Sequence, residues 1–125
     1  MIVAGFGFRT GADIVALSTA LAGAQHGHPP VTALAAPHDK LALVSDLAKT
    51  LGLRVIAVSP DALQIPQTPT QSIASLGSRQ TGSVAEASAL AAAGSGAKLL
   101  TTRHISPDRM ATCAIAQSDA QGPAI

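Results

Sequence analysis

Hydrophobic positions along the chain fall into short apolar runs separated by longer segments with helical spacing. The runs over 1–5, 31–36 and 54–58 are apolar at nearly every position, which predicts buried strands. Between them, 12–24 and 41–51 carry apolar residues three and four positions apart, which predicts helices with one buried face. Strands that alternate with helices predict an α/β domain.

Boundary signals around the middle of the chain are local and specific. Gly52 follows the last apolar position of 41–51, which predicts a left-handed C-cap. Ser59 and Pro60 follow the third strand and predict the N-cap and first residue of another helix. Residues 65–80 are rich in Gln, Thr, Ser and Pro, which predicts a surface loop with little helix.

The C-terminal part of the chain predicts one more helix over 82–94 and two strands over 98–102 and 111–116. The connection between these strands is short enough for an antiparallel pair. The expected fold is therefore a single α/β domain over 1–117, a mixed sheet of about five strands with helices packed on it. A polar tail over 118–125 is expected to fray.

Composition narrows the function classes. The 125 residues include 8 basic and 7 acidic side chains and neither Trp nor Tyr, which argues against a nucleic-acid partner. No apolar run approaches the ~20 residues of a membrane span and no signal-peptide pattern opens the chain, so we expect a cytoplasmic protein without a membrane partner. The single cysteine, Cys113, excludes an internal disulfide and is expected to be a small buried hydrophobe.

The stretch GFGFRTG joins the first strand to the first helix. Gly5, Gly7 and Gly11 would let a ligand approach the backbone, and the following helix would direct free N–H groups at an anion. Arg9 could bind a carboxylate or phosphate in bidentate fashion. The spacing is one residue longer than the dinucleotide fingerprint, and no acidic residue follows ~20 positions on, so NAD binding is disfavoured. An anion-contacting loop and a tight strand-to-helix turn both remain open.

Three further side chains, two within this stretch and one after the second strand, are candidates for the core or for ligand contact. Phe6 and Phe8 are two positions apart, so both rings should lie on one side of the strand and fill the core, with ligand stacking as the alternative. Lys40 begins a helix, where the helix dipole disfavours a cation. This placement indicates contact with a ligand anion or with Asp39, although a solvated lysine explains it equally well.

The segment before the last helix combines capping and candidate chemistry. Ser83 and Glu86 have the S-x-x-E spacing of a capping box. Glu86 is also the only glutamate of the chain and a candidate general acid or base. Arg79 and Gly82 lie just upstream, where they could cradle an anion or belong to a hinge.

The four histidines, His26, His28, His38 and His104, lack the spacing of a metal site. We therefore expect neither a metal nor a cofactor.

Several of these motifs occur together in an order that resembles one family. The order is GFGFRTG, Lys40 after the second strand, Thr70 and Ser72, Gly77, and GSVAEASAL. It resembles the CobE family, also found as the C-terminal domain of CbiG-type cobalamin-biosynthesis proteins, over residues 2–117. The resemblance implies a vitamin B12 pathway protein that handles a ring-contracted tetrapyrrole; in the two-domain relatives a lactone is opened and acetaldehyde leaves.

The resemblance turns the motifs into a functional hypothesis. The protein would bind a precorrin or corrinoid intermediate and assist lactone opening, with Glu86 as the catalytic carboxylate and Arg9 stabilising the oxyanion. The ligand-binding residues would be Gly5, Gly7, Arg9, Gly11, Lys40, Arg79, Gly82 and Ser83. A phosphate- or nucleotide-binding module without catalysis, and an accessory partner of a precorrin methyltransferase or another cobalamin-pathway enzyme, are the alternatives.

Overall fold

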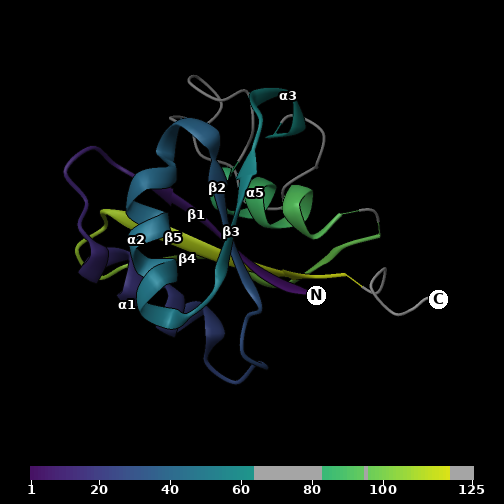
Figure 1. Cartoon of the computed structure of the whole chain (residues 1–125). Coiled ribbons are helices and arrows are strands. Elements are labelled where there is room, and N and C mark those ends of the chain that lie inside the picture. The colour runs from purple at the N-terminus through teal and green to yellow at the C-terminus, as the bar shows by residue number, and fades with distance from the viewer. Residues whose placement is uncertain (64–82, 95, 119–125) are drawn as a thin grey trace.

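The centre of the molecule is a five-stranded mixed sheet with the strand order β3-β2-β1-β5-β4 (Figure 1). The structure is a computed structural model that describes residues 1–63, 83–94 and 96–118. The strands are β1 (Ile2–Phe8), β2 (Ala33–Pro37), β3 (Arg54–Val58), β4 (Lys98–Ile105) and β5 (Ala111–Gln117). β1, β2 and β3 are parallel, whereas β5 is antiparallel to both of its neighbours. The predicted mixed α/β sheet is confirmed.

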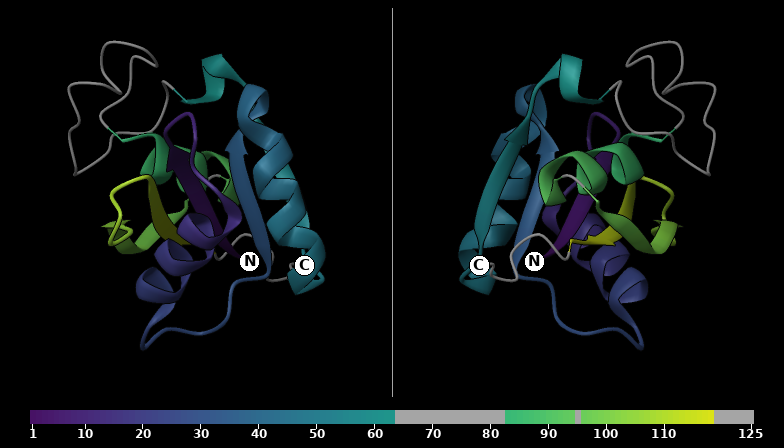
Figure 2. Two further views of the ribbon diagram at one scale, coloured as in Figure 1. Left: turned by 90° about the vertical axis from the view of Figure 1, so that its left-hand side faces the viewer. Right: turned by 90° about the vertical axis from the view of Figure 1, so that its right-hand side faces the viewer.

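Helices cover both faces of this sheet, which gives three layers (Figure 2). One face carries α1 (Ile14–Gln25) and α2 (Leu41–Leu51). The other carries α5 (Val84–Ala93) and the short α3 (Pro60–Leu63). A single 3-10 turn, η1 (His38–Lys40), connects β2 to α2.

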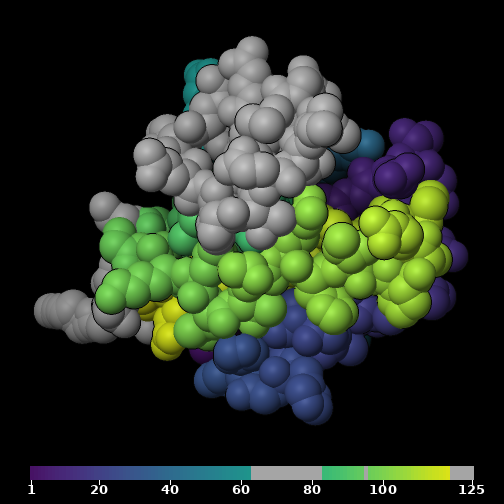
Figure 3. Space-filling view, turned by 180° about the vertical axis from the view of Figure 1, so that it is seen from behind, coloured from purple at the N-terminus to yellow at the C-terminus, as the bar shows by residue number. Residues whose placement is uncertain are grey.

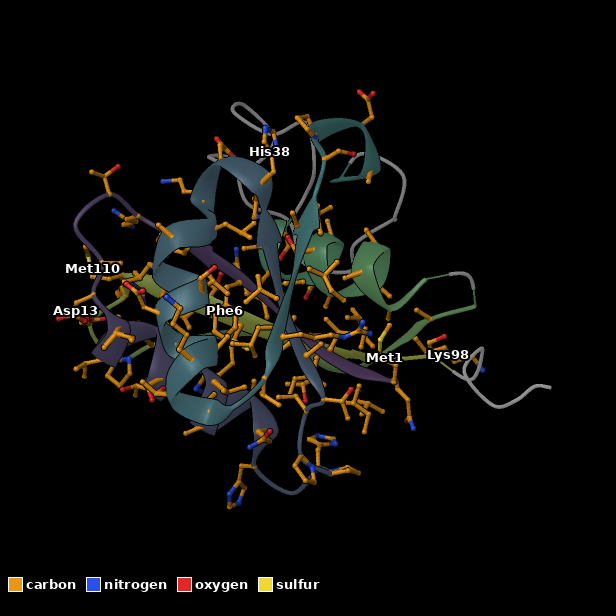
Figure 4. The ribbon with its side chains drawn as sticks, viewed as in Figure 1. Met1, Phe6, Asp13, His38, Lys98 and Met110 are labelled. Carbon is orange, nitrogen blue, oxygen red and sulfur yellow. The ribbon has the colours of Figure 1, made fainter. Side chains whose placement is uncertain are left out.

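Alternation along the strands divides the core in two. Ala4 and Phe6 of β1 point into the cluster under α1 and α2, while Val3 points into the cluster under α5. Phe6 is fully buried (Figure 4) and Phe8 packs half-buried against the same cluster, so the prediction that both rings face one side is confirmed. Cys113 is buried as expected, and this burial raises the pKa of its thiol.

The prediction that the first strand ends at Gly5 is wrong. β1 continues through Gly7 to Phe8, because it is paired with β5 along its whole length, from Ile2 to Phe8. The first helix begins at residue 14 rather than 12, since the Asp13 carboxylate accepts the backbone N–H of Ala16 at 2.9 Å and caps it.

The boundaries predicted from local signals are confirmed. The helix over 41–51 and the strand over 54–58 have the expected ends. Gly52 adopts a left-handed conformation, with φ 70°, as the C-cap. Ser59 Oγ accepts the N–H of Ala62 at 3.2 Å at the start of α3. The second strand is shifted from the expected 31–36 by two residues at its start and one at its end.

In the C-terminal part, the helix and the antiparallel strand pair are confirmed, although both strands are longer than predicted. Residue 118 is held by its N–H, which donates to the Met1 carbonyl at 3.0 Å. The predicted loop over 65–80 and the remaining tail, 119–125, lie outside the described residues. Among the residues that are described, no helix has the length and apolar character needed to cross a bilayer.

Candidate ligand-binding site

The carboxyl ends of the three parallel strands meet at one edge of the sheet (Figure 1). β5 begins at the same edge, because Ala111 pairs with Phe8. From β1 the chain first moves to β2 and β3 on one side, and later returns to β4 and β5 on the other. In open α/β sheets, ligands bind outside the strand ends at such a reversal of strand order. The end of β1 is therefore the place to look for a site.

The loop after β1 is a tight turn. The Arg9 carbonyl accepts the N–H of Ala12 at 3.0 Å, and Gly11 at the third position has φ 94°, as a type II turn requires. The Arg9 N–H donates to the Met110 carbonyl at 2.9 Å, which joins this loop to the β4–β5 turn. The turn geometry expected from the sequence is thus present, and it leaves the Arg9 side chain exposed.

Gly5 and Gly7 are explained by the packing of α5. An added Cβ at Gly5 would overlap the Ala85 carbonyl oxygen and the Ala89 nitrogen. At Gly7 an added Cβ would lie 3.0 Å from Thr112 Oγ1 and 3.3 Å from Val84 Cβ. Both glycines therefore let a helix lie directly on the strand backbone, an arrangement that needs no ligand to account for it.

Lys40 lies against the aromatic ring at the end of β1. Its Nζ is 5.3 Å from the centroid of the Phe8 ring, within range of a cation–π contact. Because Lys40 follows β2 and Phe8 ends β1, the contact joins two neighbouring strand ends. Arg9 and Lys40 consequently place two cationic residues at one edge.

The serine half of the capping box predicted at the start of α5 is confirmed. Ser83 is fully buried, and its Oγ accepts the Glu86 N–H at 3.3 Å. Val84, the next residue, lies beside Gly7. The start of α5 therefore borders the end of β1.

The Glu86 carboxylate lies on the β4 side of α5. It is fully buried, and Oε2 accepts the Arg103 N–H at 2.8 Å. The register of β4 against β5 shifts between Thr101 and His104, which interrupts the regular ladder at Arg103. Glu86 therefore satisfies a strand amide at this irregularity and fastens α5 to β4.

The predicted site residues separate into four groups. Arg9, Gly11, Lys40 and Ser83 lie on the elements that meet around the carboxyl end of β1. Gly5 and Gly7 lie within β1 under α5, and Glu86 is buried between α5 and β4. Arg79 and Gly82 are outside the described residues. Within the described ranges, no group of three His, Cys, Asp or Glu side chains could hold a metal ion.

Sequence reasoning missed Arg109 and Thr112. The Thr112 hydroxyl donates to the Gly7 carbonyl at 3.1 Å, and Arg109 precedes the carbonyl that accepts the Arg9 N–H. Both residues reach the site because β5 pairs with β1. The short connection over 106–109 predicted that the last two strands form a hairpin, but no local pattern showed that β5 pairs with β1.

Together these features define an open-sheet α/β domain with cationic residues at the carboxyl end of its parallel strands. The chain belongs to the family described as "Cobalamin synthesis G C-terminus", whose sequence profile matches residues 2–116. The comparison with curated proteins gave no significant match.

Solved structures of related proteins agree with this assignment. CobE, described as a protein from the cobalamin (vitamin B12) biosynthetic pathway, is 30% identical, with a TM-score of 0.83 over 94% of this chain and 90% of its own. The cobalamin biosynthesis protein chiG from Agrobacterium tumefaciens is 33% identical, with a TM-score of 0.70 over 95% of this chain and 99% of its own. A homolog of cobalamin biosynthesis protein G from Sulfolobus solfataricus, 20% identical, shares the fold (TM-score 0.69) over 92% of this chain and 36% of its own.

Proposed function

We propose that this protein binds an anionic, ring-contracted tetrapyrrole intermediate of cobalamin biosynthesis at the carboxyl end of β1. The observation that carries the proposal is the placement of Arg9 and of Lys40, held over Phe8, at one sheet edge. Family membership supplies the pathway. Tetrapyrrole intermediates of this pathway carry carboxylates around a largely apolar ring, which suits cations beside an aromatic side chain.

The expected affinity needs both kinds of contact. A hydrogen bond to a charged group contributes about 1.5–3 kcal/mol, so contacts from Arg9 and Lys40 supply at most about 6 kcal/mol. A dissociation constant of ~1 μM requires about 8 kcal/mol. Association itself costs about 4–15 kcal/mol, so burial of apolar surface must supply the remainder. Phe8, Ile14 and Met110 are partly exposed hydrophobic residues near the loop and supply such surface.

Binding fits the geometry better than hydrolysis does. A general acid or base must reach the substrate proton directly or through one water. The Glu86 carboxylate is fully buried and accepts the Arg103 amide, which gives it a structural task. We therefore assign Glu86 to positioning α5. Whether the protein also opens a lactone is tested separately below, with Glu86→Gln.

Titration with hydrogenobyrinic acid, followed by visible absorbance, tests the binding proposal. We expect micromolar binding that weakens ~10-fold in Arg9→Ala and in Lys40→Met. Lys49→Met, in the last turn of α2, is the matched control and should bind like the wild type. Absence of binding at protein concentrations ~100-fold above the expected dissociation constant would overturn the proposal in favour of a protein partner. Binding of ATP as tight as that of the tetrapyrrole would overturn it in favour of a nucleotide.

A second experiment addresses Glu86. Glu86→Gln keeps an oxygen that can accept the Arg103 N–H, so we expect a folded protein that binds the tetrapyrrole normally. Incubation with a lactone-containing intermediate, followed by detection of acetaldehyde, gives the catalytic readout. Acetaldehyde release by the wild type that is lost in Glu86→Gln would replace positioning with a catalytic role.

A further inference from the structure

The β4–β5 turn holds an arginine in a backbone conformation that disfavours it. Arg109 has φ 63° and is the one residue other than glycine, among those described, with a positive φ. A left-handed conformation brings Cβ close to the following carbonyl oxygen, so glycine or asparagine is usual there. Arg109 is exposed, so burial does not explain the arginine, and the disfavoured backbone conformation points to a role for the side chain.

The turn itself is fixed by hydrogen bonds that do not involve the Arg109 side chain. The backbone N–H of Arg109 donates to the Ser106 carbonyl at 2.8 Å. The Asp108 carboxylate accepts the Ser106 hydroxyl at 2.6 Å and the Met110 N–H at 3.0 Å, and these bonds lower the pKa of Asp108. The turn can therefore form with another residue at 109.

This turn is joined to the loop that carries Arg9. The carbonyl of Met110, the residue after Arg109, accepts the Arg9 N–H at 2.9 Å. In the space-filling view, the purple β1–α1 loop lies next to the yellow-green β4–β5 turn (Figure 3). The side chains of Arg9 and Arg109 are both exposed. Two exposed guanidinium groups thus stand on neighbouring turns.

We infer that Arg109 is a specificity-determining residue of the binding site, where its guanidinium, with that of Arg9, binds carboxylates of the ligand. This inference rests on the proposed function, because it names a further residue of the same site. Arginine suits the role better than lysine does, since its planar fork binds a carboxylate through two parallel hydrogen bonds. The hydrogen bond between the two turns fixes the spacing of the two backbones and so selects ligands with suitably spaced carboxylates.

The test compares affinity, salt dependence and stability in the same variants. Arg109→Asn removes the charge but tolerates the left-handed conformation. We expect ~10-fold weaker binding of hydrogenobyrinic acid, a shallower loss of affinity with added NaCl, and a urea midpoint no lower than that of the wild type. Arg109→Lys, which keeps the charge, should lose only ~3-fold.

Controls separate failure of this inference from failure of the proposed function. Arg54→Gln, at the start of edge strand β3, should leave the affinity and the salt dependence unchanged. If Arg9→Ala weakens binding but Arg109→Asn does not, Arg109 is only a turn residue and the inference falls while the proposed function stands. If the wild type binds no tetrapyrrole, the proposed function fails and the inference with it.

Discussion

The two faces of the sheet are packed in different ways. Under α1 and α2 the core contains large, fully buried side chains, among them Phe6, Leu17 and Leu34. Under α5 it consists mostly of alanines, and Gly5 lets the helix backbone approach the strand. Large side chains can adjust their rotamers, whereas two backbones in contact cannot. The α5 face should therefore tolerate change least.

Substitution of Gly5 by alanine should produce the largest loss of stability. The added Cβ overlaps backbone atoms of Ala85 and Ala89, so α5 must move away from β1. We expect at least ~3 kcal/mol of destabilisation, the upper part of the range for overpacking. Urea denaturation followed by circular dichroism measures it. Gly27→Ala is the control, because an added Cβ there meets nothing within 4 Å and only the left-handed backbone, φ 80°, opposes it, by about 1 kcal/mol. Equal midpoints for the two variants would contradict the close-contact account.

Leu34→Ala examines the opposite face and should rank second. Leu34 is fully buried in the cluster under α1 and α2. Removal of its side chain leaves a cavity and should cost about 2–3 kcal/mol if neighbouring side chains relax into it. The variant should keep a native circular dichroism spectrum with a lower urea midpoint. A larger loss than in Gly5→Ala would reverse the proposed order of the two faces.

A smaller effect is expected where a side chain, rather than a backbone, makes the close approach. The His104 ring of β4 occupies the space that a Cβ at Gly23 of α1 would fill. In Gly23→Ala the ring can rotate towards solvent, so we expect a loss of about 1 kcal/mol. A double-mutant cycle with His104→Ala provides the measurement. Additive losses would show that ring and glycine are not coupled.

The smallest predicted effect depends on pH. The Ser106 hydroxyl, and then the Met110 amide, lower the pKa of Asp108 from its ordinary value of 3.8. The folded state thus favours the ionised form, so its contribution to stability is present above pH ~4 and is lost as the pH falls through the lowered pKa. Asp108→Ala should lower the urea midpoint slightly at pH 7, with a difference that shrinks towards pH 3. A difference that stays constant over this range would exclude the linkage.

Local signals predicted the parts of the fold that depend on neighbours in sequence. The α2 helix and β3 came out with correct ends, because Gly52 and Ser59 act through hydrogen bonds to residues within a few positions. The end of β1 did not, since Gly5 favours termination locally while pairing with β5, more than 100 residues away, extends the strand. Pairing at that separation leaves no periodic pattern in a single sequence.

The candidate site shows the same division. Arg9 was found because it lies in the glycine-rich stretch between a predicted strand and a predicted helix, and Lys40 because it begins a predicted helix. The Ser83 cap was found from its spacing to Glu86. The bond from Arg103 to the Glu86 carboxylate was not, because it depends on a register shift in β4. Arg109 was missed for a related reason, since only the pairing of β5 with β1 brings its turn beside Arg9.

The hydrogen bonds between the first and last described residues bear on how this domain can be tethered. The Met1 amino group donates to the Ser118 carbonyl at 3.2 Å, beside the pairing of Ile2 with Gln117. Met1 and Lys98 lie at one end of the molecule and Asp13 and Met110 at the other (Figure 4). A covalent linker attached at Met1 or at Ser118 would therefore leave the molecule at the end opposite the β1–α1 loop. A fused domain could then be joined there without crossing the rim that carries Arg9 and Lys40.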